Sequence, residues 1–317
     1  FDYQTWEGHY GLVKLNLQEK TVRDYLFSVV KYWMKDIGID GWRLDVAYLI
    51  PNDFWREFRK ICKEINPECL LVGELIHGPY SKWVDKDLLD AGTEYQVYKS
   101  IWSSINSQNM HELKAVLANS YHPQWGHLKD RIMMNFLGNH DTTRIRSILT
   151  DDRHLAVAFL ILFTLNGFPK IYYGDEIGLK GIKTPQSDTD VRRPMVLPNG
   201  DWPSNGKEIF NMINKVIELR QKNHALIYGN LTALYADNET GNILAYLRQS
   251  SKQTLLVIIN ANFETMNTRI PLWNITLENE RFKDILNTDD QQEYVVKNDQ
   301  ININNLESCW GKVLEKI

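Results

Sequence analysis

Charged side chains close short apolar runs of this 317-residue sequence, and their types and spacing suit nucleophilic and acid-base chemistry. Arg43 and Asp45 lie two residues apart at the end of one run, so on a strand both side chains point to one face. A guanidinium beside a carboxylate favours the ionised form, as a nucleophile requires. Glu74 follows three apolar or small residues, which predicts a partly desolvated general acid. Asn-His-Asp at 139–141 ends a third run.

Two carboxylates on opposite sides of a scissile bond are the minimal equipment for glycoside hydrolysis. Strand-terminal Asp and Glu also bind metal ions in other barrels, or cap the helix that follows. The residue types alone therefore leave three interpretations open: glycoside hydrolysis, metal-assisted chemistry and structural capping.

The apolar periodicity indicates the elements that would hold these residues. Between about residues 20 and 225, helical periods alternate with short apolar runs, as in β/α proteins, whose barrels carry chemistry where strands end. The sequence predicts strands at 39–46, 69–75, 89–95, 131–137 and 168–173, and helices at 22–36, 54–65, 108–119, 152–165 and 207–223. After residue 225, strand-like runs follow one another without a helical stretch, so the last ~90 residues predict a separate antiparallel β domain.

Composition excludes several classes of function. With 36 basic and 40 acidic residues the net charge is −4, so the sequence shows no excess of positive charge that would bind nucleic acid or an anionic membrane surface. The longest apolar run, 155–163, is far shorter than the roughly 20 residues of a membrane span. Three scattered cysteines suit neither a disulfide framework nor a zinc site, and they are compatible with a cytoplasmic location.

The strings around the charged residues resemble signature regions of the α-amylase family of glycoside hydrolases. GWRLDVA at 41–47, VGEL at 72–75 and FLGNHD at 136–141 occur in the family's order. IYYGDEIG at 171–178 and RRPM at 192–195 add to the likeness, and KLN at 14–16 is most similar to the branch of neopullulanases, cyclomaltodextrinases and maltogenic amylases. The resemblance implies the C-terminal part of a (β/α)8 TIM barrel, with about five strands, at 1–225 and an all-β antiparallel sandwich domain at 226–317.

Carried over residue by residue, the resemblance makes Asp45 the nucleophile, Glu74 the acid/base and Asp141 the transition-state stabiliser. Arg43 and His140 match residues that assist them. The implied reaction is a retaining double displacement through a covalent glycosyl-enzyme, with the two reacting carboxyl groups about 5 to 5.5 Å apart.

Further residues match the family at its loops. Asp188 and Arg192 resemble a loop that contacts sugars on the non-reducing side. His77 lies, with Trp6 and Trp83, where a loop residue could contact glucose units. Asp175, Glu176 and Arg144 are interpreted as supports of the barrel and of the Asn-His-Asp turn.

The largest departure from the family pattern is at the front of the chain. A full barrel has eight strands and the sequence supplies five, so three strands and the family's first signature region are missing. Residues 1–16 resemble the tail of the domain inserted after the third strand. We expect a C-terminal portion of a longer enzyme, whose N-terminal half is absent or held in a separate chain. The family's calcium ligands lie largely in that half, so no cofactor is expected.

The function that the resemblance implies is hydrolysis of α-1,4 glucosidic bonds in cyclodextrins, pullulan or malto-oligosaccharides, with α-1,6 bonds as a second target. Two alternatives stay open. The same covalent intermediate can pass to a sugar, which describes a transglycosylase, and an oligo-α-glucosidase would use the same residues. A non-catalytic amylase-like sugar-binding fragment is the alternative from another class.

Overall fold

The structure, a computed structural model, describes residues 3–197, 200–237, 241–272, 275, 278–289 and 292–317. The chain forms two compact units, residues 1–92 and 93–317.

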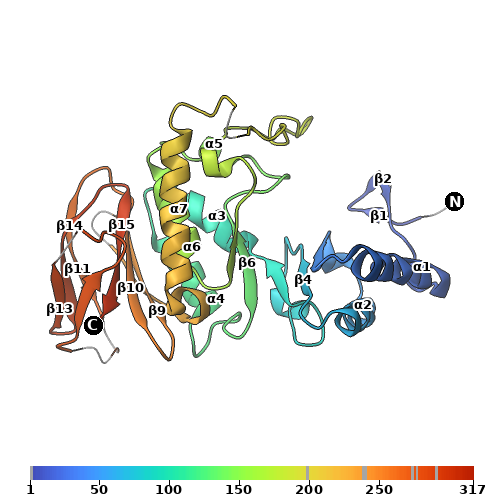
Figure 1. Ribbon diagram of the computed structural model, residues 1–317, viewed down its shortest axis with the longest axis horizontal. Helices are drawn as coiled ribbons and strands as arrows, with labels where there is room; N and C mark the ends of the chain where they lie inside the picture. The colour runs from blue at the N-terminus through green and yellow to red at the C-terminus, as the bar shows by residue number, and fades with distance from the viewer. Residues whose placement is uncertain (1–2, 198–199, 238–240, 273–274, 276–277, 290–291) are drawn as a thin grey trace. The chain divides into compact units, whose positions relative to one another are not determined.

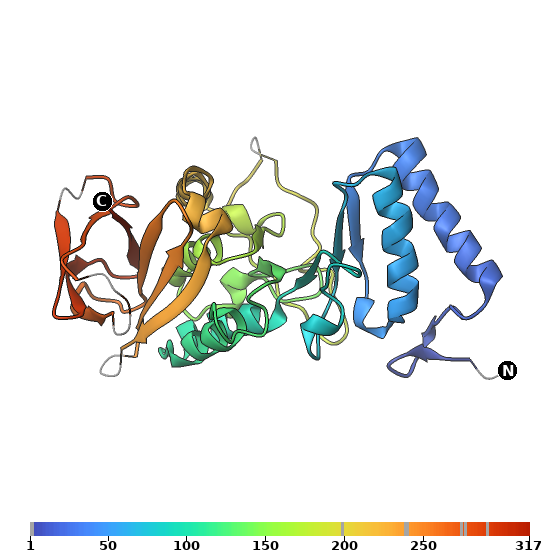
Figure 2. The ribbon, with the colours of Figure 1, turned by 90° about the horizontal axis from the view of Figure 1, so that it is seen from below.

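The first unit contains parallel strands and two long helices that lie side by side (Figures 1 and 2). β3 (Gly41–Leu44), β4 (Leu70–Gly73) and β5 (Ala91–Thr93) pair in parallel in chain order. The remaining elements are the hairpin β1 (Thr5–Trp6) and β2 (His9–Val13), the helices α1 (Lys20–Lys31) and α2 (Asn52–Ile65), the π-helical turn η1 (Tyr32–Ile37), and the 3-10 turns η2 (Ala47–Leu49) and η3 (Tyr80–Lys82).

One face of α1 and of the π-helical turn η1 is buried. Phe27 and Val30 are buried in α1, and Phe27 stacks on Phe54 of α2 at a centroid distance of 5.2 Å. Met34 in the π turn is buried on the same face, four residues after Val30, whereas Trp33, within the helix predicted at 22–36, is 43% exposed. Gly38 ends the turn with φ 83°, as a C-terminal glycine is expected to do.

A glycine sets the spacing of the first two parallel strands. A Cβ atom at Gly41 would lie 2.2 Å from the carbonyl oxygen of Leu70 on the paired strand β4. Only glycine allows the two backbones to approach this closely, so Gly41 fixes the position of the strand that leads to Asp45.

The second unit begins with the rest of the β/α part. β6 (Ile132–Phe136) and β7 (Phe168–Lys170) pair in parallel. Helix α6 (His154–Thr164) is buried on all sides and packs against the long α7 (Gly206–Lys222) (Figure 1). The helices of this part are α3 (Tyr95–Asn106), α4 (His111–Tyr121), α5 (Ile145–Ile148), α6 (His154–Thr164), the 3-10 turn η4 (Asp175–Ile177), α7 (Gly206–Lys222) and α8 (His224–Tyr228).

The C-terminal part of the second unit is one antiparallel sheet, which curls so that β8 contacts β11 (Figures 1 and 2). Its strand order is β11-β14-β13-β12-β15-β10-β9-β8. Alternating residues such as Ile301 and Ile303 point into its core, as side chains on one face of a strand do. The strands are β8 (Asn230–Ala236), β9 (Ile243–Gln249), β10 (Thr254–Asn260), β11 (Met266–Pro271), β12 (Arg281–Asp284), β13 (Glu293–Lys297), β14 (Gln300–Leu306) and β15 (Trp310–Lys316).

Two buried arginines bond to carbonyl groups at the end of α6, and one of them, Arg248, connects α6 to this sheet. Arg248 of β9 donates to the carbonyl oxygens of Thr164 and Gly229. Arg220 of α7 donates to the carbonyl oxygen of Phe163 at 2.9 Å, and also to those of Leu165 and Gly167. The carbonyl groups at the C-terminal end of α6 are thereby satisfied. The predicted fold class, a partial parallel β/α barrel of five strands followed by an antiparallel β domain, is confirmed.

Candidate active site

The end of β3 brings Arg43 and Asp45 together, as strand alternation predicts. Arg43 Nη1 lies 2.5 Å from Asp45 Oδ1, and the Asp45 side chain is 73% exposed. The next residue, Val46, has φ 45°, a left-handed conformation that is unfavourable for a β-branched residue. The backbone therefore turns sharply directly after Asp45, which leaves this carboxylate at the tip of the strand.

Glu74 follows β4 and is buried, with 5% of its side chain exposed. Its Oε1 accepts from Arg43 Nη2 at 2.8 Å, and its Oε2 accepts from the Val46 backbone N–H at 3.2 Å. The Glu74 backbone N–H also donates to the Leu44 carbonyl at 2.8 Å. The burial predicted for Glu74 is present, and one planar guanidinium bonds to both carboxylates.

Of the aromatic candidates of the first unit, His77 and Trp83 lie in loops and Trp6 ends strand β1. His77 is exposed and meets the ring of Tyr48 edge to face at 6.1 Å. Trp6 stacks on His9 at 5.1 Å, and Trp83 lies next to the Lys82 ammonium. His77 thereby contacts the segment that follows Asp45, because Tyr48 lies in η2.

In the second unit, the polar turn after β6 holds Asp141. The Asn139 side-chain oxygen accepts from the Asp141 backbone N–H at 2.8 Å, and the Asn139 amide group donates to the Tyr95 hydroxyl at 2.8 Å. Thr142 Oγ1 accepts from the Asn139 backbone N–H at 2.9 Å. Side chain to backbone bonds thus fix the conformation of the turn that presents Asp141.

Cationic groups and a histidine surround the Asp141 carboxylate. His140 Nε2 lies 2.9 Å from Oδ2, and Arg192 Nη2 lies 2.8 Å from Oδ1. The same Arg192 nitrogen lies 2.8 Å from Asp188 Oδ2, so the predicted loop pair joins the Asn-His-Asp turn. Lys183 Nζ is 3.8 Å from Asp141 Oδ1. Sequence reasoning missed the Lys183 contact and the direct bond from Arg192 to Asp141, since both join loops that are distant in the chain.

Arg144, three residues after Asp141, forms a buried ion pair, and its support of the Asn-His-Asp turn stays a prediction. Its Nη1 lies 2.9 Å from Asp175 Oδ1, and it donates to the carbonyls of Tyr173 and Val191 at 2.8 and 2.9 Å. Burial raises the pKa of Asp175 to about 7, although the Arg144 charge opposes this rise. The contacts agree with a structural role for Asp175.

Glu94 is a buried carboxyl group that sequence reasoning missed. It follows β5 and accepts from the Val97 N–H at the start of α3, at 3.4 Å. Burial raises its pKa to about 8, so it is protonated at neutral pH. The signal that identified the other carboxylates, an acidic residue at the end of a predicted strand, was present at 89–95 as well.

The described residues include no group of three or more His, Cys, Asp or Glu side chains that could hold a metal ion. In the same part of the chain, no helix is both long and apolar enough to cross a membrane. Cys62, Cys69 and Cys309 are buried and free.

Comparisons with known proteins extend over both parts of the chain. The family model described as "Alpha amylase, catalytic domain" matches residues 2–196, and "Alpha amylase, C-terminal all-beta domain" matches residues 235–309. A cyclomaltodextrinase from a Bacillus species is 34% identical over 260 residues, which are 81% of this chain and 45% of that protein. Neopullulanase 2 from Thermoactinomyces vulgaris is 33% identical over 255 residues, 79% of this chain and 41% of that protein.

A solved structure is similar as well. The crystal structure of an α-amylase from Geobacillus thermoleovorans with acarbose has a TM-score of 0.81 and 26% identity, and the match covers 97% of this chain and 66% of that one. The chain spans less than half the length of the two curated relatives. Because the catalytic-domain model matches more than half of its residues, the chain belongs to the α-amylase family of glycoside hydrolases.

Proposed function

We propose that this chain carries the reacting side chains of a retaining α-glucan hydrolase. The observation that supports this most strongly is the single guanidinium of Arg43, which bonds to the exposed Asp45 and to the buried Glu74. An accessible carboxylate can attack carbon, whereas a buried carboxyl group is suited to hold and transfer a proton. Two carboxylates within reach of one guanidinium suit the short separation of retaining enzymes better than the longer one of inverting enzymes.

In the first step, Glu74 gives its proton to the glycosidic oxygen while an Asp45 oxygen attacks the anomeric carbon. The bond from that carbon to the glycosidic oxygen breaks, and the shortened glucan leaves with the proton of Glu74. Asp45 is then bound to the glycosyl unit as an ester, and Glu74 is ionised.

In the second step, Glu74 acts as a base. It takes a proton from a water molecule whose oxygen attacks the anomeric carbon, the ester bond to Asp45 breaks, and both carboxyl groups return to their starting states. Transfer to a sugar hydroxyl in place of water follows the same course and would make the chain a transglycosylase.

Asp141 and its neighbours act on the sugar ring and not on the broken bond. We assign to Asp141 the binding of sugar hydroxyls in the distorted ring of the transition state, with His140 donating a hydrogen bond next to it. Arg192 and Asp188 extend this polar cluster, and we assign to them contacts with sugar units on the non-reducing side of the substrate. We assign to His77, in the exposed loop that follows Glu74, a contact with a glucose unit.

The substrates we propose are cyclodextrins, pullulan and malto-oligosaccharides, cleaved at α-1,4 bonds and at α-1,6 bonds as a second target. The names of the two curated relatives, a cyclomaltodextrinase and a neopullulanase, support this choice.

The test is release of reducing sugar from γ-cyclodextrin and maltotriose by the chain and by Glu74→Gln. Loss of the acid is expected to lower turnover roughly 10²- to 10⁴-fold. Glu64→Gln, an exposed glutamate on α2, is the matched control and is expected to keep full turnover. The released sugar should first appear as the α anomer by NMR.

Unchanged turnover in Glu74→Gln, or a β anomer as the first product, would contradict the mechanism. A folded, unaltered chain that binds maltotriose without any turnover would be a sugar-binding fragment.

We also propose that the chain works together with the barrel strands that its relatives have and these 317 residues lack. Apolar rings on the first unit support this, since Tyr10, Tyr25 and Trp33 are all exposed. The native mass of the purified chain tests it, and an associated species is expected. A monodisperse monomer of 37.1 kDa would contradict the need for a partner.

For location we propose the cytoplasm. The three free thiols support it, and burial raises the pKa of Cys62 to about 12, so that thiol stays protonated. Recovery of the protein from the culture medium instead of the cell lysate would contradict it.

A further inference from the structure

A lysine of the parallel sheet reaches the turn that presents Asp141, and no step of the proposed reaction uses it. Lys170 is the last residue of β7 and pairs in register with Phe136 of β6. Its side chain is half-buried, in a position where lysine is uncommon. The Nζ atom lies 3.1 Å from the carbonyl oxygen of Gly138, just beyond the end of β6. Lys170 therefore connects one strand to the backbone that follows the next.

The peptide group between Gly138 and Asn139 is held at both of its ends. Its carbonyl oxygen accepts from the Lys170 ammonium, and its N–H donates to Thr142 Oγ1 at 2.9 Å. A peptide group is planar, so these two bonds together fix its orientation. A hydrogen bond from a charged donor is about twice as strong as one between neutral groups, so Lys170 supplies the stronger of the two.

This peptide group determines where Asn139, and through it Asp141, lies. The Asn139 side-chain oxygen accepts from the Asp141 backbone N–H at 2.8 Å, and its amide group donates to the Tyr95 hydroxyl at 2.8 Å. A rotation of the peptide group would move the Asn139 Cα atom and strain both of these bonds. The Lys170 ammonium thus acts on the Asp141 backbone through Asn139.

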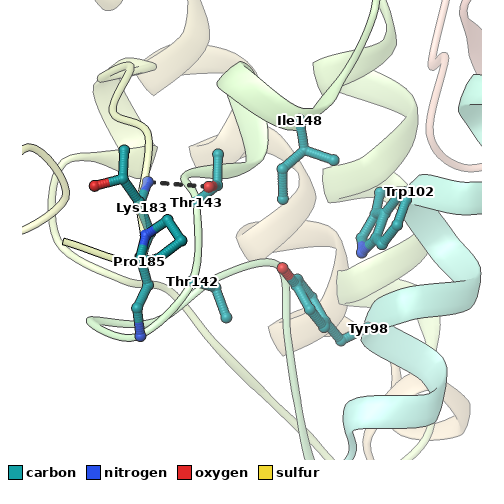
Figure 3. Close-up of a pocket in the computed structure, with 8 residues that line it drawn as sticks. Tyr98, Trp102, Thr142, Thr143, Ile148, Lys183 and Pro185 are labelled. Carbon is teal, nitrogen blue, oxygen red and sulfur yellow. Dashed lines mark hydrogen bonds between the residues drawn. The ribbon is translucent and has the colours of Figure 1, made fainter. Parts of the chain in front are cut away.

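The other end of the turn is fixed without Lys170. Thr142 and Thr143 line a pocket, and Thr143 Oγ1 accepts from the Lys183 backbone N–H at 3.1 Å (dashed line in Figure 3). The Arg144 backbone N–H donates to the carbonyl oxygen of Gly181 at 3.0 Å. Loss of the Lys170 ammonium should therefore loosen the first half of the turn and leave the second half in place.

Neighbouring groups stabilise the ammonium at this half-buried position. The Lys170 Nζ atom lies 5.0 Å from the centroid of the Tyr172 ring, a cation–π distance. A Cβ atom at Gly138 would lie 3.3 Å from Asp175 Oδ2, so this carboxyl group lies close to the same peptide group. Burial raises the pKa of Asp175 to about 7, and the charges of Arg144 and Lys170 oppose the rise.

We propose that Lys170 is a positioning residue for the reaction, which holds the peptide group between Gly138 and Asn139 and through it the carboxylate of Asp141. The proposal rests on the role proposed above for Asp141, binding of the distorted sugar ring. Because that interaction belongs to the transition state, its weakening lowers kcat more than it raises KM.

The kinetic test is Lys170→Met, which keeps an unbranched side chain and removes the ammonium. With γ-cyclodextrin, kcat is expected to fall roughly three- to thirtyfold while KM changes by less than about twofold. Lys170→Arg keeps a cationic donor and is expected to retain kcat within about threefold of the parent. Lys222→Met removes an exposed lysine of α7 and, as the matched control, should behave as the parent does.

Hydrogen–deuterium exchange tests the same contact without turnover. In Lys170→Met, the backbone amides of Asn139 and Asp141 are expected to exchange roughly three- to tenfold faster than in the parent. The amides of β10 in the core of the β domain should keep their exchange rates. A general loss of stability would speed exchange in both regions, whereas a positioning contact affects the turn alone.

The proposal is overturned if Lys170→Met keeps the kcat of the parent, if Lys170→Arg loses as much kcat as Lys170→Met, or if exchange speeds up equally in β10. Failure of the proposed function is a different result, because the unaltered chain would then release no sugar from γ-cyclodextrin. The exchange measurement decides in that case. Faster exchange confined to the turn supports the positioning contact, and unchanged exchange overturns it.

Discussion

The buried carboxyl group of Glu94 makes the stability of this protein depend on pH in an unusual direction. Glu94 is fully buried at the N-terminal end of α3. Among the described residues, the groups that bond to its carboxyl group are backbone N–H groups and a tyrosine hydroxyl, and none of them is a cation. Burial raises its pKa to about 8, so the folded protein holds a proton that an unfolded glutamate near pKa 4.5 releases. The substitution to make is Glu94→Gln, which keeps the shape and cannot ionise.

The sign follows from the number of bound protons. Between pH 4.5 and 8 the folded state binds more protons at this site than the unfolded state, so its contribution to stability is full below 4.5 and is lost as pH rises through 8. Each pH unit inside the window corresponds to about 1.4 kcal/mol. From pH 6 to pH 9 the parent should therefore lose roughly 2–3 kcal/mol relative to Glu94→Gln.

The assay is urea unfolding of the parent and the variant at pH 6 and pH 9. At each pH the free energy of unfolding of the variant is subtracted from that of the parent, so that the contributions of other titrating groups cancel. Glu218→Gln, an exposed glutamate on α7, is the control and should show no pH-dependent difference. If Glu94→Gln differs from the parent by the same free energy at both pH values, Glu94 is not a buried acid that holds its proton, and the reasoning is wrong.

Two other substitutions test the supports of the site. Arg144→Met removes the cation from a pair whose side chains are 1% and 2% exposed, and it should lower the free energy of unfolding by about 3–5 kcal/mol, measured in urea. A loss below about 1 kcal/mol would show that Asp175 does not need Arg144. Gly41→Ala places a Cβ 2.2 Å from the Leu70 carbonyl oxygen, so it should cost about 1–3 kcal/mol and reduce turnover by moving Arg43. Gly11→Ala, where a Cβ meets nothing within 4 Å, should change neither, and equal effects at both glycines would refute the close-approach argument.

The five parallel strands were predictable because each lies within a short apolar run between turn signals. The helix α3 was not predicted, and its sequence shows why. Its buried face includes Ser100 and Ser104 between apolar residues, so the apolar period is interrupted. The Ser104 hydroxyl accepts from the Leu113 N–H of α4, which explains a polar residue at a buried position. Small polar residues that bond to a neighbouring helix hide the pattern on which the prediction depends.

At the candidate site, the parts governed by local geometry were predictable and the long-range contacts were not. The pairing of Arg43 with Asp45 follows from strand alternation over two residues. Arg192 and Asp141 are 51 residues apart, and their bond depends on how the loop after β7 returns to the turn after β6. No periodicity encodes such a return, and Lys183 was missed for the same reason.

The environment of each carboxyl group, more than its residue type, separates the roles proposed here. Asp45 and Glu74 share the guanidinium of Arg43, yet one is 73% exposed and the other 5%. The shared cation draws both groups to one place, and the difference in burial then distinguishes an accessible nucleophile from a shielded proton carrier. Asp175 shows that a cation alone does not make a reactive site, because its pair with Arg144 is closed to solvent on both sides. We therefore expect a variant that exposes Glu74 but keeps its bond to Arg43 to lose turnover. A variant that only lengthens the distance between Arg43 and Asp45 is expected to lose less turnover.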